Sequence, residues 1–408
     1  MAASAETIIP ASPGSSASEP KILAFEFHGS GVEFFKIWIV NLALTILSLG
    51  IFSAWAKVRT QRYLYGNTRL DGHAFTYLAD PVKILKGRFI AFGFLLVYSL
   101  AWNFYPDAGM LLLVIGVLLL PAILVAATRF KMRNSSYRNL RFGFNTRFTT
   151  AYRMFASPMM IVLLLTGLGY GLLQFVDLDT LMTSLQPVDD EVEQPVSISA
   201  AQLIPSIFYL VLLPFIPYLD YLRSHFVIDN SHYGNAPARL KSSVGSFYET
   251  YLMSLLVFIV AISIGIALLM GIFGLISLLD TETNSNLIGV VAAIAGVVSM
   301  YAMMFFAAGY FHARRTNLIY GNGFFGDAQL ISKLKFMPVS WIFLSNTVAI
   351  ILSLGLLIPW ARIRMARYVA GVTHLQSSNF ALITAVENAG QGALGEGVVD
   401  AFDLDIGL

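Results

Sequence analysis

Long apolar runs separated by short charged connections make up most of the chain. A helix that crosses the hydrocarbon core of a bilayer needs about 20 mostly apolar residues, because the core is about 30 Å thick. Eight segments approach this length. They cover residues 37–56, 88–105, 109–128, 158–176, 204–222, 251–279, 288–311 and 339–360. Backbone groups within lipid need internal hydrogen bonds, so the pattern predicts helices and an all-α, polytopic transmembrane helical bundle.

Charge divides the connections into two classes. The connections 104–108, 177–203 and 280–287 contain nine acidic residues and no Lys or Arg, whereas the other connections are basic. Lys and Arg keep a connection in the cytoplasm. We therefore expect three membrane hairpins between residues 88 and 311, with acidic turns outside and basic connections inside.

Composition supports a membrane protein. The chain is 57% hydrophobic and 12% charged, whereas soluble domains average about 45–50% and about 25%. The absence of cysteine excludes disulfides and thiolate metal sites. Residues 1–23, rich in Ala, Ser and Pro, are expected to form a disordered tail. Residues 24–380 are expected to form one multi-pass membrane domain, and residues 381–408 a flexible acidic tail.

An internal repeat brackets the three hairpins. Residues 41–75 and 346–380 align without a gap at an offset of 305, and 15 of 35 positions are identical. If both copies span the membrane, the chain has eight spans and inverted repeats. If each copy enters and returns on the cytoplasmic side, it has six spans plus two re-entrant elements, with Leu-Ser-Leu-Gly at 47–50 and 352–355 as the turns. The second arrangement is favoured, because inversion places one basic motif outside.

The strongest candidate site is a helical face that occurs once in each copy. It carries one Trp and two Arg at positions i, i+4 and i+7, which lie on one side of a helix. The residues are Trp55, Arg59 and Arg62 in the first copy, and Trp360, Arg364 and Arg367 in the second. Trp prefers the headgroup level and Arg pairs bidentately with phosphate. The face is thus a candidate site for an anionic lipid headgroup or a phosphorylated ligand; ordinary interfacial anchoring is the alternative.

Polar residues within the apolar segments are few. Asn41 and Asn346 occupy equivalent positions in the two copies, and a buried amide needs hydrogen-bond partners. Bonding to each other, contact between helices and binding of a substrate are the three readings. Asp220 is the nearest ionisable residue to a membrane interior, at the cytoplasmic end of its segment. This scarcity argues against a proton- or sodium-driven pump.

No motif predicts an enzyme. The histidines lack metal-ligand spacing, and phosphate-loop, nucleophile-elbow and dinucleotide motifs are absent, so neither a metal nor a cofactor is expected. The expected partners are membrane lipids, with a protein partner or a second copy of the chain as further options, and no nucleic acid. A transporter or channel for a small solute is the main alternative. An enzyme acting on lipid would have to assemble side chains such as His73, Asp80 and His225.

Several motifs resemble the YjgN-like family of bacterial inner-membrane proteins. They are Phe-Glu-Phe-His-Gly at 25–29, Ser-Ala-Trp-Ala-Lys-Val-Arg at 53–59, and Arg-Asn-Ser-Ser-Tyr-Arg-Asn-Leu-Arg-Phe-Gly at 133–143. The resemblance covers residues 24–380. It implies a multi-pass protein of the bacterial inner membrane, from a family without an assigned function, and it brings no catalytic residues.

Overall fold

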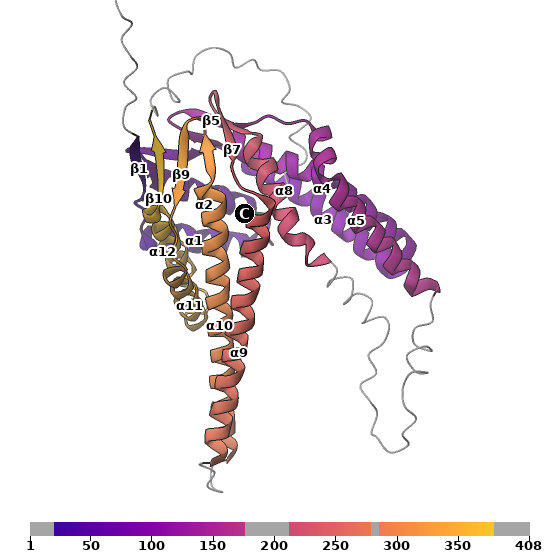
Figure 1. Cartoon of the computed structure of the whole chain (residues 1–408). Helices are drawn as coiled ribbons and strands as arrows, with labels where there is room; N and C mark the ends of the chain where they lie inside the picture. The colour runs from indigo at the N-terminus through magenta and orange to yellow at the C-terminus, as the bar shows by residue number, and fades with distance from the viewer. Residues whose placement is uncertain (1–19, 176–211, 279–284, 379–408) are drawn as a thin grey trace, which may run out of the picture.

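Ten short strands close an antiparallel β-barrel from which long helices extend (Figure 1). The computed structural model describes residues 20–175, 212–278 and 285–378. The strand order around the barrel is β1-β10-β9-β8-β7-β6-β5-β4-β3-β2, and β2 pairs with β1 to close the ring. The strands are β1 (Lys21–Phe27), β2 (Thr68–Leu70), β3 (His73–Tyr77), β4 (Ser135–Tyr137), β5 (Leu140–Phe144), β6 (Ser231–Tyr233), β7 (Ala236–Leu240), β8 (Gly323–Phe325), β9 (Ala328–Ser332) and β10 (Thr373–Ser377).

The prediction of an all-α helical bundle is therefore wrong. The strands lie in the segments that charge identifies as connections, and most are only three or five residues long. Such strands are too short to show a recognisable alternation of apolar and polar residues. The long apolar helices, of up to 37 residues, dominate the pattern instead. Closure stabilises them, because a barrel gives every strand a partner on both sides.

The described chain passes five times through the same β-α-α-β order. The helices are α1 (Gly31–Leu47), α2 (Ser53–Asn67), α3 (Pro81–Phe104), α4 (Pro106–Arg133), α5 (Phe148–Phe175), α8 (Phe215–Asp229), α9 (Val244–Leu278), α10 (Ser285–Gly321), α11 (Phe336–Leu352) and α12 (Ile358–Val372). We call the five passes units 1 to 5. Unit 1 runs from β1 to β2, unit 2 from β3 to β4, unit 3 from β5 to β6, unit 4 from β7 to β8, and unit 5 from β9 to β10.

Apolar side chains from all five units fill the barrel. The third residue of the strand that ends each unit belongs to one core cluster. These residues are Leu70, Tyr137, Tyr233, Phe325 and Leu375. The Tyr137 hydroxyl donates to the Leu70 carbonyl at 2.7 Å, and the Tyr233 hydroxyl donates to the Tyr137 carbonyl at 2.9 Å. The five units thus converge on one interior, in which the hydroxyls of Tyr137 and Tyr233 each have a carbonyl partner.

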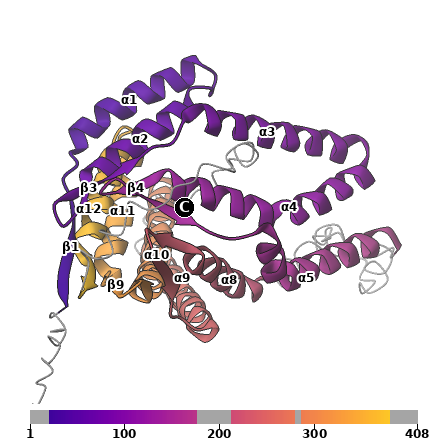
Figure 2. The same ribbon diagram turned by 90° about the horizontal axis from the view of Figure 1, so that it is seen from above.

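Among the described residues, five helical segments are long and apolar enough to cross a membrane. They are Pro81–Phe104, Pro106–Arg133, Phe148–Gly169, Val244–Gly274 and Gly289–Gly321. Seen from above, α3 and α4 extend to one side, whereas α1 with α2 and α9 with α10 leave in other directions (Figure 2). Each helical hairpin thus begins and ends at the barrel, and hairpins of neighbouring units contact each other, as α10 does with α11 and α12 with α1.

Several predicted segments lie outside the described residues. They include residues 1–19 and 381–408 of the predicted tails, 204–211 of the fifth apolar segment, and the acidic connection 177–203. Strand β1 begins at Lys21, within the range 1–23 predicted as tail.

Each copy of the repeat forms a helical hairpin that returns to the barrel. The apolar segments 37–56 and 339–360 each break into two helices at the predicted Leu-Ser-Leu-Gly turns. Strands β1 and β10 pair, so the two ends of the described chain meet in the barrel. Both copies therefore have the same orientation relative to the barrel.

Candidate functional site

The two copies share an Asn–Arg contact inside their hairpins. Arg59 Nη1 donates to Asn41 Oδ1 at 3.1 Å, and Arg364 Nη1 donates to Asn346 Oδ1 at 3.2 Å. Each Asn amide in turn donates to a carbonyl of the second helix, Ala56 in one copy and Ala361 in the other. Asn41 and Asn346 thus each join the two helices of their own hairpin, and they bond to this partner rather than to each other.

Arg62 and Arg367 contact the next unit around the barrel. Arg62 Nη2 donates to the Ala79 carbonyl at 3.4 Å, two residues before α3. Arg367 Nη2 donates to the Gly29 carbonyl at 3.0 Å, two residues before α1. Arg367 therefore ties unit 5 to unit 1, where the chain closes on itself.

The same contact occurs at all five boundaries between units. The donor always lies six residues before the strand that ends its unit, and the acceptor is always the carbonyl two residues before the next unit's first helix. We call the donors clasp residues. They are Arg62, Arg129, His225, Asn317 and Arg367, and their acceptors are the carbonyls of Ala79, Thr146, Ser242, Leu334 and Gly29. Arg62 and Arg367 thus have a structural role in addition to any role in binding.

The clasps could not be recognised in the sequence, because three residue types (Arg, His and Asn) fill the same position in different units. A neighbouring signal was present. The residue before the closing strand is Asn in four units, and its amide donates back to the helix four residues earlier. These residues are Asn67, Asn134, Asn230 and Asn322. Alignment on them places the clasp five residues upstream in each of these units.

Substitution of His225 tests the role of the clasps, and Asn317 of unit 4 shows which replacement should be tolerated. His225→Leu removes the donor to the Ser242 carbonyl, and we expect a loss of about 1 kcal/mol in the free energy of unfolding, because a partly buried carbonyl loses its hydrogen-bond partner. His225→Asn should lose less, because Asn317 serves as the clasp of unit 4 at 2.8 Å. Thermal unfolding of the two variants in detergent checks the order. Equal losses contradict the assignment of His225 as a clasp.

A tyrosine of each hairpin also holds the start of the hairpin's first helix. The Tyr63 hydroxyl accepts from the Ser30 amide at 2.8 Å, and the Tyr368 hydroxyl accepts from the Lys335 amide at 3.1 Å. Burial raises the pKa of Tyr63, and the contact with Glu33 adds to this effect while the Ser30 bond opposes it. The hydroxyl therefore stays protonated at neutral pH.

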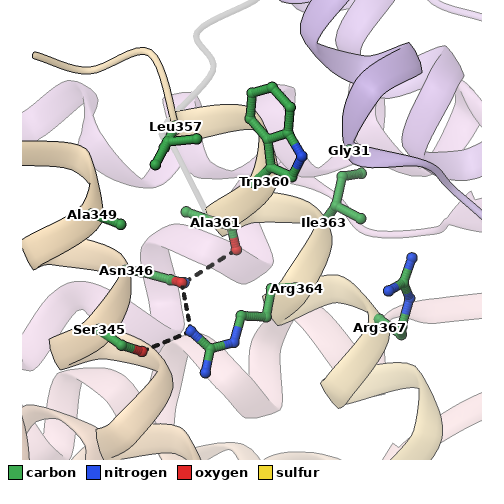
Figure 3. A pocket seen from close by; sticks show the side chains of 10 residues that line it. All are labelled: Gly31, Ser345, Asn346, Ala349, Leu357, Trp360, Ala361, Ile363, Arg364 and Arg367. Carbon is green, nitrogen blue, oxygen red and sulfur yellow. Dashed lines mark hydrogen bonds between the residues drawn. The ribbon is translucent and has the colours of Figure 1, made fainter. Parts of the chain in front are cut away.

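A hollow of about 280 Å³ lies where the second copy meets unit 1 (Figure 3). Its lining includes Trp360, Arg364 and Arg367 from α12, Asn346 from α11, and Gly31 from α1. A Cβ on Gly31 would lie 2.5 Å from the Trp360 indole. Gly31 thus lets the indole lie directly against α1. We call this hollow the α12–α1 groove.

Trp55 has a different environment from Trp360. It is partly buried beside Ala54, Val58 and Ile84, at the boundary between units 1 and 2, and its ring stacks on Phe52. Trp360 is 37% exposed. The candidate face of the second copy thus borders an open groove, whereas Trp55 packs at the boundary between units 1 and 2.

The other ionisable candidates serve separate structural contacts. The Asp80 carboxylate accepts from the Val82 amide and caps α3, whereas His73 lies beside Arg138. Together with His225, these side chains belong to three different contacts. Asp220 is buried and pairs with Arg315 across α8 and α10. Among the described residues, no group of three His, Asp or Glu side chains is placed to hold a metal ion.

Comparison with known proteins decides the family. The model of a family described as bacterial protein of unknown function (DUF898) matches residues 22–401. The chain belongs to the DUF898 family. This DUF898 chain is 30% identical over 141 residues to an inner membrane protein YjgN of Salmonella typhimurium, and 32% identical over 124 residues to an inner membrane protein YjgN of Escherichia coli K12.

These alignments cover about a third of each protein. They span 34% of this chain and 36% of the Salmonella relative, and 30% of this chain and 31% of the Escherichia relative. No solved structure matches the chain. Together with the five membrane-length helices in the described part of the chain, the relatives confirm the predicted location: this DUF898 chain is a multi-pass protein of the bacterial inner membrane.

Proposed function

We propose that the protein binds the phosphate of an anionic lipid headgroup in the α12–α1 groove. The observation that carries the proposal is the lining of the groove, where Trp360, Arg364 and Arg367 border one hollow. Both arginines are exposed, and among the described residues no carboxylate is within ion-pair distance of either. Each guanidinium has five N–H donors, and the bonds to protein use only part of them.

The position of the groove along its hairpin fits a headgroup. Leu354, in the turn before α12, is 94% exposed. Trp360 follows in the first turn of α12, and Arg364 lies about 9 Å along the axis from Ile358. This order, from apolar turn to aromatic ring to cation, matches the change from acyl chain to headgroup in a bilayer. The basic connections at the barrel favour its placement in the cytoplasm.

A matched pair of variants tests the proposal. Arg362 is exposed on the same helix but does not line the groove. We expect Arg364→Ala to reduce the phosphatidylglycerol retained by purified protein several-fold, whereas Arg362→Ala retains it, as measured by native mass spectrometry. Equal retention by the two variants would refute the headgroup site. Loss in both would assign retention to general charge rather than to the groove.

A solute pathway has less support. The interior of the barrel is filled by apolar side chains from all five units. The α3–α4 and α9–α10 hairpins leave the barrel in different directions (Figure 2). Neither feature favours a channel along the barrel axis.

A further inference from the structure

The turns of the two short hairpins expose the same apolar residues. Leu47 and Leu49 of the first hairpin are 80% and 95% exposed, and Leu352 and Leu354 of the second are 80% and 94% exposed. Ile46 and Ile51, with Ile351 and Leu356, extend each surface. We call these two surfaces the hairpin tips. They match position by position, although about 300 residues and six of the described helices separate them in the sequence.

Each tip has a leucine in a backbone conformation that leucine rarely adopts. Leu49 and Leu354 have φ angles of 49° and 50°, in the left-handed region. Gly or Asn adopts this region more readily than a side chain such as Leu. Gly50 and Gly355 follow, with φ of 90° and 91°. Two equivalent turns thus keep a large apolar side chain at the apex, despite its conformational cost and its exposure.

The hairpins are too short to cross a bilayer and return. Helix α1 has 17 residues and α2 has 15, which corresponds to about 25 and 22 Å at 1.5 Å per residue, against a core of about 30 Å. Charge limits the depth further. Lys57 is the fifth residue of α2, and Arg362 is the fifth residue of α12. Only about one helical turn and the connecting loop therefore separate each apex from the first cation.

We propose that both hairpin tips insert into the hydrocarbon of the leaflet that the barrel faces, as half-depth anchors that do not cross. The occupant of these surfaces is lipid acyl chain, because exposed leucines at the apex give way to Trp and then to Arg along the same helix. Two insertions at separate units fix the barrel at a defined height above the membrane. Insertion follows from the exposure of the tip leucines and from the length of the hairpins, and it does not require the headgroup site.

The absence of native cysteine allows a direct measurement of depth. Single cysteines at Leu49 and Leu354 carry an environment-sensitive fluorophore in the full chain, reconstituted in phosphatidylethanolamine–phosphatidylglycerol vesicles with nitroxide lipids. Both side chains are almost fully exposed, so their replacement removes little packing. Asp327→Cys, exposed in the turn between β8 and β9, is the aqueous control. Asp107→Cys, at the α3–α4 turn, marks the outer surface in intact cells.

We expect the labels at 49 and 354 to be quenched most strongly by a nitroxide within the acyl chain, and the label at 327 to be quenched little. An impermeant maleimide added to intact cells should label position 107 and spare positions 49 and 354. Outside labelling of 49 or 354 would mean that the hairpins span, and weak quenching by lipid would place the tips in water or against protein. Either result overturns the proposal. A failure of the Arg364 test alone leaves it unaffected.

Discussion

Asp220→Ala is expected to lower the free energy of unfolding by about 3 kcal/mol, one of the two largest effects in this molecule. The Asp220 carboxylate accepts two bonds from Arg315, at 2.6 Å from Nη2 and 2.7 Å from Nε. Tyr251 donates a third at 3.2 Å. The Asp220 side chain is only 8% exposed. Removal of one partner of such a pair leaves the other charge uncompensated, which costs more than the pair itself contributes.

A double variant separates this explanation from a simple packing loss. Asp220→Leu combined with Arg315→Met removes both charges and keeps apolar volume, so it should recover much of the stability that Asp220→Ala loses. Thermal unfolding in detergent, followed by circular dichroism, measures both. If the double variant is less stable than Asp220→Ala, the uncompensated charge is not the cause.

Tyr137→Ala is expected to lower the free energy of unfolding by about 3–5 kcal/mol, the range for truncation of a buried aromatic side chain. Tyr137 is 2% exposed in the centre of the barrel, where its ring packs against Phe75 and Tyr233. Burial raises its pKa, so the hydroxyl is protonated and donates to the Leu70 carbonyl. The cavity left by Tyr137→Ala would border Leu70, Phe75 and Tyr233, which belong to three different units.

Tyr137→Phe is the matched control. It keeps the ring and removes only the hydroxyl, so we expect a loss of about 1 kcal/mol. Denaturation of both variants in the same detergent gives the difference. A small loss for Tyr137→Ala would mean that the barrel interior does not contribute to the stability of the fold.

The features that could be predicted from the sequence are those that a contiguous stretch of residues determines. Apolar length located the helices, since α4 and α10 contain a predicted segment each, and α3 and α9 contain all but the last residue of theirs. The polar break Leu-Ser-Leu-Gly located both hairpin turns, because a turn is a local property of a few residues. Recognition of Asn41 and Arg59 as equivalent to Asn346 and Arg364 followed from a gapless alignment.

The barrel could not be predicted in the same way. A strand such as Thr68–Leu70 has three residues, and its partners come from other units. The five units differ in helix length from 15 to 37 residues, so their closing strands recur at unequal spacing and no fixed period reveals them. The clasp residues depend on these non-local partners, since Arg367 and Gly29 lie 338 positions apart.

The clasps also refine the candidate site. Arg62 and Arg367 belong to a ring of five contacts, so their substitution disturbs the barrel as well as any ligand. Arg364 has its hydrogen bonds within its own hairpin, to Ser345 and Asn346. It is therefore the residue whose loss reports most directly on binding.

The described chain closes as a ten-stranded barrel through pairing of β1 with β10. Ile22 on β1 faces Gln376 on β10, and Gln376 faces Gln329 on β9. We would introduce cysteine pairs at 22 and 376, at 376 and 329, and at 22 and 329, and oxidise purified membranes. The barrel predicts disulfides in the first two pairs and none in the third, which lies two strands apart, beyond the reach of a disulfide. Absence of a disulfide between positions 22 and 376, with the other outcomes unchanged, would contradict closure of the barrel.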